Sequence, residues 1–144
     1  MPSVNDFPAR GKIIEVKTGV VVFQPSNTNY QIWLNVPDAT QYQISAHPIE
    51  CLIRVSARKV YTVPSGGNFI QPIFGPPKII QGRVKYADER TIVVQAGVPI
   101  IVDLPAAESA IDLSDGKIQV GHMANVVASP GAAFTSADAA IAAV

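Results

Sequence analysis

Few side chains in this sequence are able to carry nucleophilic or acid–base chemistry. Its two histidines are His47 and His122, and its one cysteine, Cys51, stands among apolar neighbours. An activated nucleophile needs a base within hydrogen-bond reach, and neither histidine lies in a recognisable catalytic signature. We interpret both histidines as residues of turns or of a barrel rim, and Cys51 as a core residue. Asp88 and Glu89 fall in a predicted hairpin turn, where charges are solvated, so the chain alone is expected not to be an enzyme.

Metal and phosphate sites are not indicated by the sequence either. His47, Glu50 and Cys51 lie close together, but side chains on a strand alternate between its two faces, so the three cannot point one way. The glycine-rich segment 65–68 lacks the Lys-Ser/Thr ending and the helix of a phosphate-binding loop, and we interpret it as a turn. No metal ion and no cofactor is therefore expected.

One pattern, basic residues close to aromatic ones, indicates binding of single-stranded nucleic acid. Proteins of that class combine a positive groove with aromatic faces on which bases stack, and nine of the ten aromatic residues here lie in residues 1–86. The candidate residues for binding nucleic acid or a protein partner are Arg54, Arg58, Lys59, Tyr61 and Tyr30. A net charge of zero and a pI near 6.7 weigh against this function, because such a protein must neutralise several phosphates. Nucleic-acid binding is therefore the second hypothesis.

Composition and charge favour association with other chains. Charged residues make up 15% of the sequence, against about 25% in typical domains, and a chain with so few charges either exposes apolar area or covers it against another chain. Residues 1–85 carry nine Lys/Arg and four Asp/Glu, a net charge of +5, whereas residues 86–144 carry two and seven, a net charge of −5. Because the two halves of the sequence carry opposite net charge, they favour head-to-tail contacts, in which the basic half of one chain meets the acidic half of the next. The leading hypothesis is a non-enzymatic structural or assembly module that binds itself or another protein, and the third is an accessory subunit of a larger enzyme.

The sequence also aligns with itself, which indicates an internal duplication. In each copy a strand that begins with glycine precedes a Val-rich strand and a strand ending in Asn/Asp-x-Pro. The matched segments are 11–13 with 82–84, 21–23 with 92–94, and 32–37 with 100–105.

Runs of β-branched residues bounded by turn residues predict four or five short strands in each copy. Because so small a unit cannot leave both sheet edges bare, we expect each copy to close into a small β-barrel of the OB or SH3-like kind. The predicted fold is all-β, with two tandem barrels at 1–63 and 82–134, a packed Pro/Gly-rich connector at 64–81 and an Ala-rich tail at 135–144. One larger barrel or sandwich is the alternative. Trp33, which alternates with apolar neighbours, is assigned to the core.

The sequence favours a cytoplasmic protein with no membrane partner. No apolar run approaches the roughly 18 residues of a membrane helix, and the first ten residues lack the basic-then-apolar pattern of a signal peptide.

Overall fold

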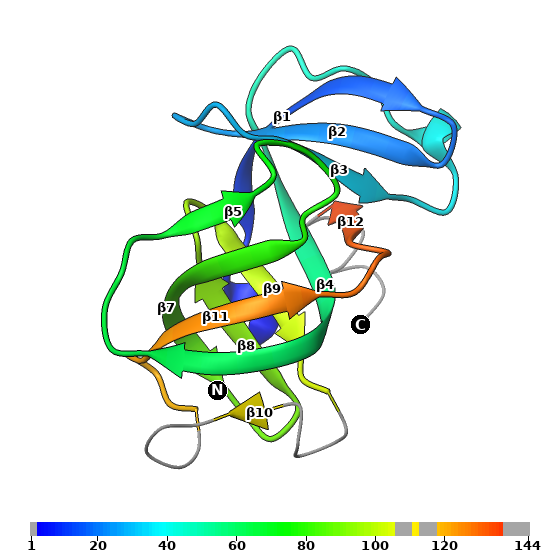
Figure 1. Ribbon diagram of the computed structural model, residues 1–144. Helices are drawn as coiled ribbons and strands as arrows, with labels where there is room; N and C mark the ends of the chain where they lie inside the picture. Colours follow the sequence, from blue (N-terminus) through cyan, green and yellow to red (C-terminus); the bar gives the residue numbers. More distant parts are fainter. Residues whose placement is uncertain (1–2, 106–110, 113–117, 137–144) are drawn as a thin grey trace.

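The computed structural model describes residues 3–105, 111–112 and 118–136 and shows an all-β chain (Figure 1). Two short 3-10 turns, η1 (Val4–Asp6) and η2 (Ala39–Gln41), are the only helical elements among these residues. The all-β prediction is confirmed. Of the predicted tail, residues 137–144 lie outside the described residues. The strands are β1 (Ala9–Lys17), β2 (Val20–Pro25), β3 (Gln31–Asn35), β4 (Ile49–Val63), β5 (Phe69–Gln71), β6 (Phe74–Gly75), β7 (Ile79–Ala87), β8 (Thr91–Gln95), β9 (Pro99–Asp103), β10 (Ile111–Asp112), β11 (Met123–Ala128) and β12 (Ala133–Ser136).

Two antiparallel meanders, β1–β2–β3 and β7–β8–β9, have the same register between their second and third strands. Val21 pairs with Leu34 in the first meander, and Ile92 pairs with Val102 in the second. These are the positions that the self-alignment of the sequence matches. The duplication itself stays a prediction.

Each meander also has an irregularity at the same place in its first strand. The pairing register shifts after Ile13 in β1 and after Val84 in β7. A bulge of this kind adds one unpaired residue and changes which face the following side chains take. As a result, Val16 and Ala87 return to the core side, where both pack against the apolar cluster.

The long strand β4 joins the two meanders because it has pairing partners on both edges. Residues 49–51 pair with β1 and 51–54 with β12, whereas 54–56 pair with β9 and 57–63 with β11. Since β11 also pairs with β7, the strands β4, β11, β7, β8 and β9 close a ring of five. In Figure 1, β4 passes from the β1–β3 layer at the top into this ring below.

The strands of the two predicted units are therefore interleaved in one mixed sheet. β4 lies within 1–63 but forms a wall of the ring, while β12, at the end of the second unit, pairs with β3 and β4. Sequence alone could not show this exchange, because each strand pattern is equally satisfied by a partner from either copy. The chain has a partly closed sheet, and its division into two barrels stays a prediction.

One apolar cluster connects both meanders. It contains Phe23 of β2, Val94 and Ile100 of the second meander, Ile53 of β4 and Phe134 of β12, each at most 2% exposed. The rings of Phe23 and Phe134 lie 6.0 Å apart between centroids. Burying side chains of this size stabilises a fold by about 1.5–3 kcal/mol each, so the cluster couples strands that are distant in sequence.

A second, smaller cluster covers the outward side of β8 and β9. Val93 and Ile101, which pair with each other, are buried there with Leu52 of β4. Val4 and Phe7, just before β1, pack over them. The N-terminal segment therefore covers the outer face of the second meander.

The two glycines that begin the matched strands provide a test of the register. A Cβ at Gly11 or Gly82 would overlap the backbone carbonyl oxygen of Gln24 or Gln95, so Gly11→Ala and Gly82→Ala should each destabilise the fold by about 1–3 kcal/mol in urea unfolding. Gly67→Ala is the control, because a Cβ there meets nothing within 4 Å, and its stability should be unchanged or slightly higher. Wild-type stability of Gly82→Ala would contradict the pairing of β7 with β8.

The interleaving provides a second test, in which the chain is cut after residue 66. Separately produced fragments 1–66 and 67–144 should form a one-to-one complex, since β4 must pair with β9, β11 and β12. Backbone hydrogen bonds and apolar contacts hold this complex, so it should persist at about 1 M salt, where the Debye length is only about 3 Å. Two fragments that fold alone and do not bind each other, judged by circular dichroism and light scattering, would contradict the shared strand.

Candidate functional site

Arg54, the first candidate binding residue, is engaged in an ion pair within the chain. Its Nε donates to Oδ2 of Asp103 at 2.8 Å, and its Nη2 donates to Oδ1 at 2.7 Å. The contact arises because β4 and β9 pair in parallel along residues 54–56. The hydrogen bonds to Asp103 raise the pKa of Arg54 above its already high usual value. This bidentate ion pair occupies the guanidinium group of Arg54. It also joins the basic and acidic halves of the sequence within one molecule.

Asp88 stabilises a turn close to this pair. Its carboxylate accepts the backbone N–H groups of Arg90 and Thr91 and the hydroxyl of Tyr86, each at 2.8 Å. The backbone N–H of Arg90 and the Tyr86 hydroxyl lower the pKa of Asp88, and the same hydrogen bond from its hydroxyl raises the pKa of Tyr86. An ionised carboxylate with a lowered pKa is a weak base. The arrangement is that of a turn, as the sequence predicts, rather than that of an acid–base pair.

Tyr30 is positioned apart from the other candidates and has a packing role. Its hydroxyl accepts the backbone N–H of Ile70 in β5 at 3.2 Å, and its ring packs against the apolar cluster and beside Gly97. In the sheet, β5 is separated from β4 by β7 and β11, a distance of about 14 Å at the usual strand spacing. The structure therefore does not bring Tyr30 together with Tyr61.

Arg58, Lys59 and Tyr61 lie on the part of β4 that pairs with β11. Val60 is fully buried, so its neighbours Lys59 and Tyr61 point outward, and the Lys59 ammonium lies 5.8 Å from the centroid of the Tyr61 ring. Arg58 is exposed at the register shift between β4 and β11. These three residues form one basic and aromatic stretch.

Two amide side chains, which the sequence analysis missed, continue this outer face across the sheet. Asn125 of β11 is the pairing partner of both Tyr61 and Gln81 of β7. Asn125 Nδ2 donates to Gln81 Oε1 at 2.9 Å, and Gln81 Nε2 donates to the carbonyl oxygen of Gly67 at 3.0 Å. The glycine-rich loop after β4 therefore lies above the amides, and both are buried. Asn125 Oδ1 has no hydrogen-bond partner among the described residues.

A depression of about 240 Å³ lies beside these amides, at the end of β4. The described residues that line it are Thr62, Val63, Pro64, Arg83, Gly121, His122 and Met123, and none of these is acidic. Arg83 Nη1 donates to the Gly121 carbonyl oxygen at 2.6 Å, which holds the guanidinium at the rim. His122 Nδ1 accepts the backbone N–H of Gln119 at 3.2 Å. Arg83 therefore gives the described lining a cationic side chain.

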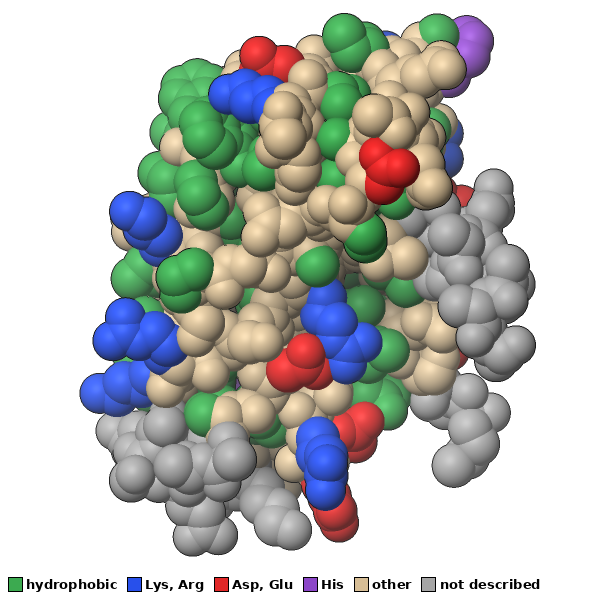
Figure 2. Space-filling view, turned by 90° about the vertical axis from the view of Figure 1, so that its right-hand side faces the viewer, with side chains coloured by type: hydrophobic (Ala, Val, Ile, Leu, Met, Phe, Trp, Pro, Cys, Tyr) green, Lys and Arg blue, Asp and Glu red, His purple; other side chains and the backbone are tan. Residues whose placement is uncertain are grey.

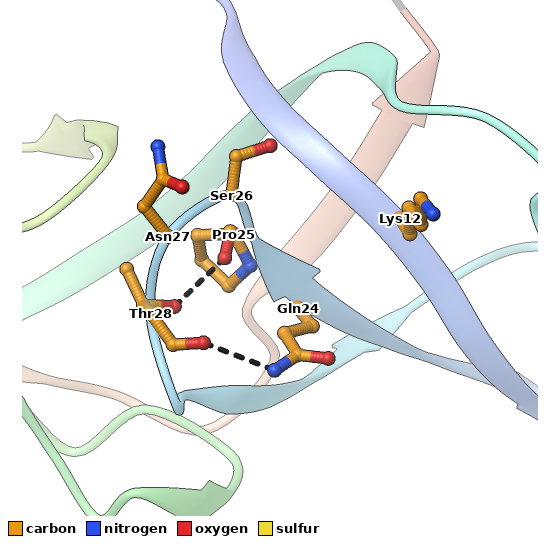
Figure 3. A pocket seen from close by; sticks show the side chains of 6 residues that line it. All are labelled: Lys12, Gln24, Pro25, Ser26, Asn27 and Thr28. Carbon is orange, nitrogen blue, oxygen red and sulfur yellow. Dashed lines mark hydrogen bonds between the residues drawn. The ribbon is translucent and has the colours of Figure 1, made fainter.

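A second depression, of about 270 Å³, belongs to the turn between β2 and β3 (Figure 3). The Thr28 hydroxyl donates to the Pro25 carbonyl oxygen at 2.8 Å, and Gln24 Nε2 donates to the Thr28 carbonyl oxygen at 3.0 Å. Asn27 has a φ of 63°, which a tight turn requires. In Figure 3, Lys12 stands apart on β1. These polar groups of the turn hydrogen-bond to one another, so we interpret the depression as part of the turn and not as a binding site.

The assignment of Trp33 to the core is wrong. Its neighbours Ile32 and Leu34 point inward and are buried, so Trp33 points outward, where it is 37% exposed. The Lys17 ammonium lies 3.9 Å from the centroid of its ring. Alternation along a strand shows which residues share a face, but it does not show which of the two faces is buried. Here the face that carries Trp33 is the outer face of the sheet.

Neither a metal cluster nor a membrane-crossing helix is found in the described part of the chain. No group of three or more His, Cys, Asp and Glu side chains there could hold a metal ion. Glu50 is exposed and Cys51 is buried, as expected from strand alternation. None of the described helical elements has the length and apolar character that crossing a membrane requires.

The reactivity of Cys51 tests its placement in the core. The side chain is fully buried, and this burial raises the pKa of the thiol, so the reactive thiolate is strongly disfavoured in the folded protein. A thiol reagent such as DTNB should therefore label the native protein only as fast as it unfolds, and label one thiol at once in denaturant. Rapid, complete labelling of the native protein would show that Cys51 is accessible.

Comparison with known proteins gives no family for this chain: no family model matches it, and no curated protein or solved structure is significantly similar. Its function is therefore inferred from the side chains and contacts described above.

Proposed function

We propose that this protein is a non-enzymatic assembly module that associates with a second copy of itself through the outward face of β3 and β6. The observation that carries the proposal is an exposed apolar patch formed by Trp33 and Phe74, which are 37% and 62% exposed. Phe74 pairs with Gln31, two residues before Trp33, so the two aromatic side chains share one face. Figure 2 shows hydrophobic side chains gathered at the upper left of one side of the molecule.

Comparison of the two meanders supports the patch as an interface. Trp33 pairs with Val22 in the first meander, as Ile101 pairs with Val93 in the second. Val4 and Phe7 pack over the second pair and leave Ile101 only 1% exposed, whereas Trp33, with the Lys17 ammonium over its ring, is still 37% exposed. A second copy of the chain would cover the first meander as the N-terminal segment covers the second.

Strand pairing between copies is a less suitable mode of association. β2 and β8 have neighbours on both edges, and β4 has partners along both of its edges. Few of the long strands that the structure describes are left to accept another chain, and association therefore depends on side-chain contacts. Because Arg54 and Asp103 already join the two charged halves within one molecule, apolar contacts contribute more than head-to-tail charge attraction.

The proposal is non-enzymatic because the reactive side chains have structural roles. The Cys51 thiol is buried, and Asp88 is held by the turn that it stabilises. We further propose that the two meanders are copies of one unit and that each belongs to a small barrel, supported by their shared register and matching bulges.

Light scattering over a range of concentrations tests the interface. The wild-type chain should show a dimer, about twice the 15.3 kDa of the monomer, and this mass should depend only weakly on salt. Phe74→Ser should weaken the dimer at least about tenfold in Kd, because exposed aromatic residues commonly dominate such contacts. Ile44→Ser is the matched control, since Ile44 is 67% exposed outside the patch. A wild-type monomer at all concentrations, or equal effects of the two variants, would disprove the interface.

A further inference from the structure

We propose a second binding function, in which the outer face of β4, β11 and β7 binds single-stranded nucleic acid beside the loop 64–68. The face is defined here by Arg58, Lys59, Tyr61 and Arg83, and it is separate from the apolar patch on β3 and β6. Its outward positions on residues 58–63 of β4, on 79–83 of β7 and on β11 include no acidic residue, whereas Asp112 of β10, at the edge of this face, pairs in parallel with Tyr61.

Pairing in the sheet places these side chains close together. Met123 of β11 pairs with both Val63 and Arg83, so Arg83 lies across the sheet from the end of β4. Tyr61 is two residues before Val63 on the same face, a rise of about 7 Å. Lys59 stands next to Tyr61, with its ammonium 5.8 Å from the ring centroid. An aromatic face and cations on two strands thus surround one area.

The depression at the end of β4 suits a phosphate group. Arg83 lines it, and none of its described lining residues is acidic. Arginine binds phosphate through several N–H donors in a planar fork, of which one here bonds to Gly121. When a phosphate of the nucleic-acid strand is bound in this depression, the adjacent base lies near Tyr61.

The combination favours a single strand over other polyanions. Single-strand binding combines cations along the backbone with aromatic faces for the bases, whereas an acidic peptide needs only the cations. Figure 2 shows basic side chains in a column along the left edge, the side that faces the viewer in Figure 1, where β4, β7 and β11 lie.

Fluorescence anisotropy of labelled oligo-dT and oligo-U at about 50 mM salt tests this site. The wild-type chain should bind with a salt dependence typical of phosphate contacts. Lys59→Gln and Arg83→Gln should each weaken binding at least about fivefold and reduce the salt slope by about one. Lys12→Gln is the matched control, because Lys12 is an exposed lysine on β1, and it should bind as wild type does.

Two variants of Tyr61 separate base stacking from simple charge attraction. Tyr61→Ala should weaken binding about tenfold without changing the salt slope, and Tyr61→Phe should restore it. Circular dichroism melts show whether each variant is folded. Absence of binding by the wild type, or an equal loss in Lys12→Gln and Lys59→Gln, would overturn the proposal. Binding that an acidic peptide abolishes and Tyr61→Ala does not affect would also overturn it, by identifying a general polyanion surface.

Discussion

A fifteen-residue strand hydrogen-bonded along both edges is the constraint on which the other features of this structure depend. β4 pairs with β1 and β12 near its start and with β9 and β11 further along. The second meander cannot close without it, since the ring of five strands uses β4 as a wall, and the first meander pairs with β4 through β1. The apolar cluster follows the same plan, because Ile53 of β4 is buried together with Phe23 and Val94 of the two meanders.

The path of β4 also decides what its charged side chains do. Before the register shift at residues 57–59, Arg54 lies beside β9 and pairs with Asp103. After the shift, Lys59 and Tyr61 lie on the outer face beside β11 and β7. One strand therefore contributes both a contact that joins the halves of the molecule and a surface that is available to a ligand. The apolar patch of Trp33 and Phe74 lies elsewhere, so assembly and nucleic-acid binding are compatible proposals.

Local patterns predicted the strands well, because burial on one face produces alternation that a sequence shows directly. Ile32 and Leu34 pointed correctly to a buried strand face, but the same pattern placed Trp33 wrongly. Contacts between strands distant in sequence were not predictable: the Asp103 partner of Arg54 is 49 residues away. Gln81 and Asn125 join Tyr61 only through the pairing of three strands, and nothing local in the sequence indicates it.

Hydrogen exchange of backbone amides, followed by NMR at several low denaturant concentrations, tests most directly whether β4 couples the two meanders. If it does, amides in the middle of β2, β4 and β8 should exchange with the same free energy of opening and the same denaturant dependence, because all three open only in global unfolding. Opening free energies for β2 and β8 that differ by more than about 2 kcal/mol, with separate denaturant dependences, would show two independent units and contradict the shared strand.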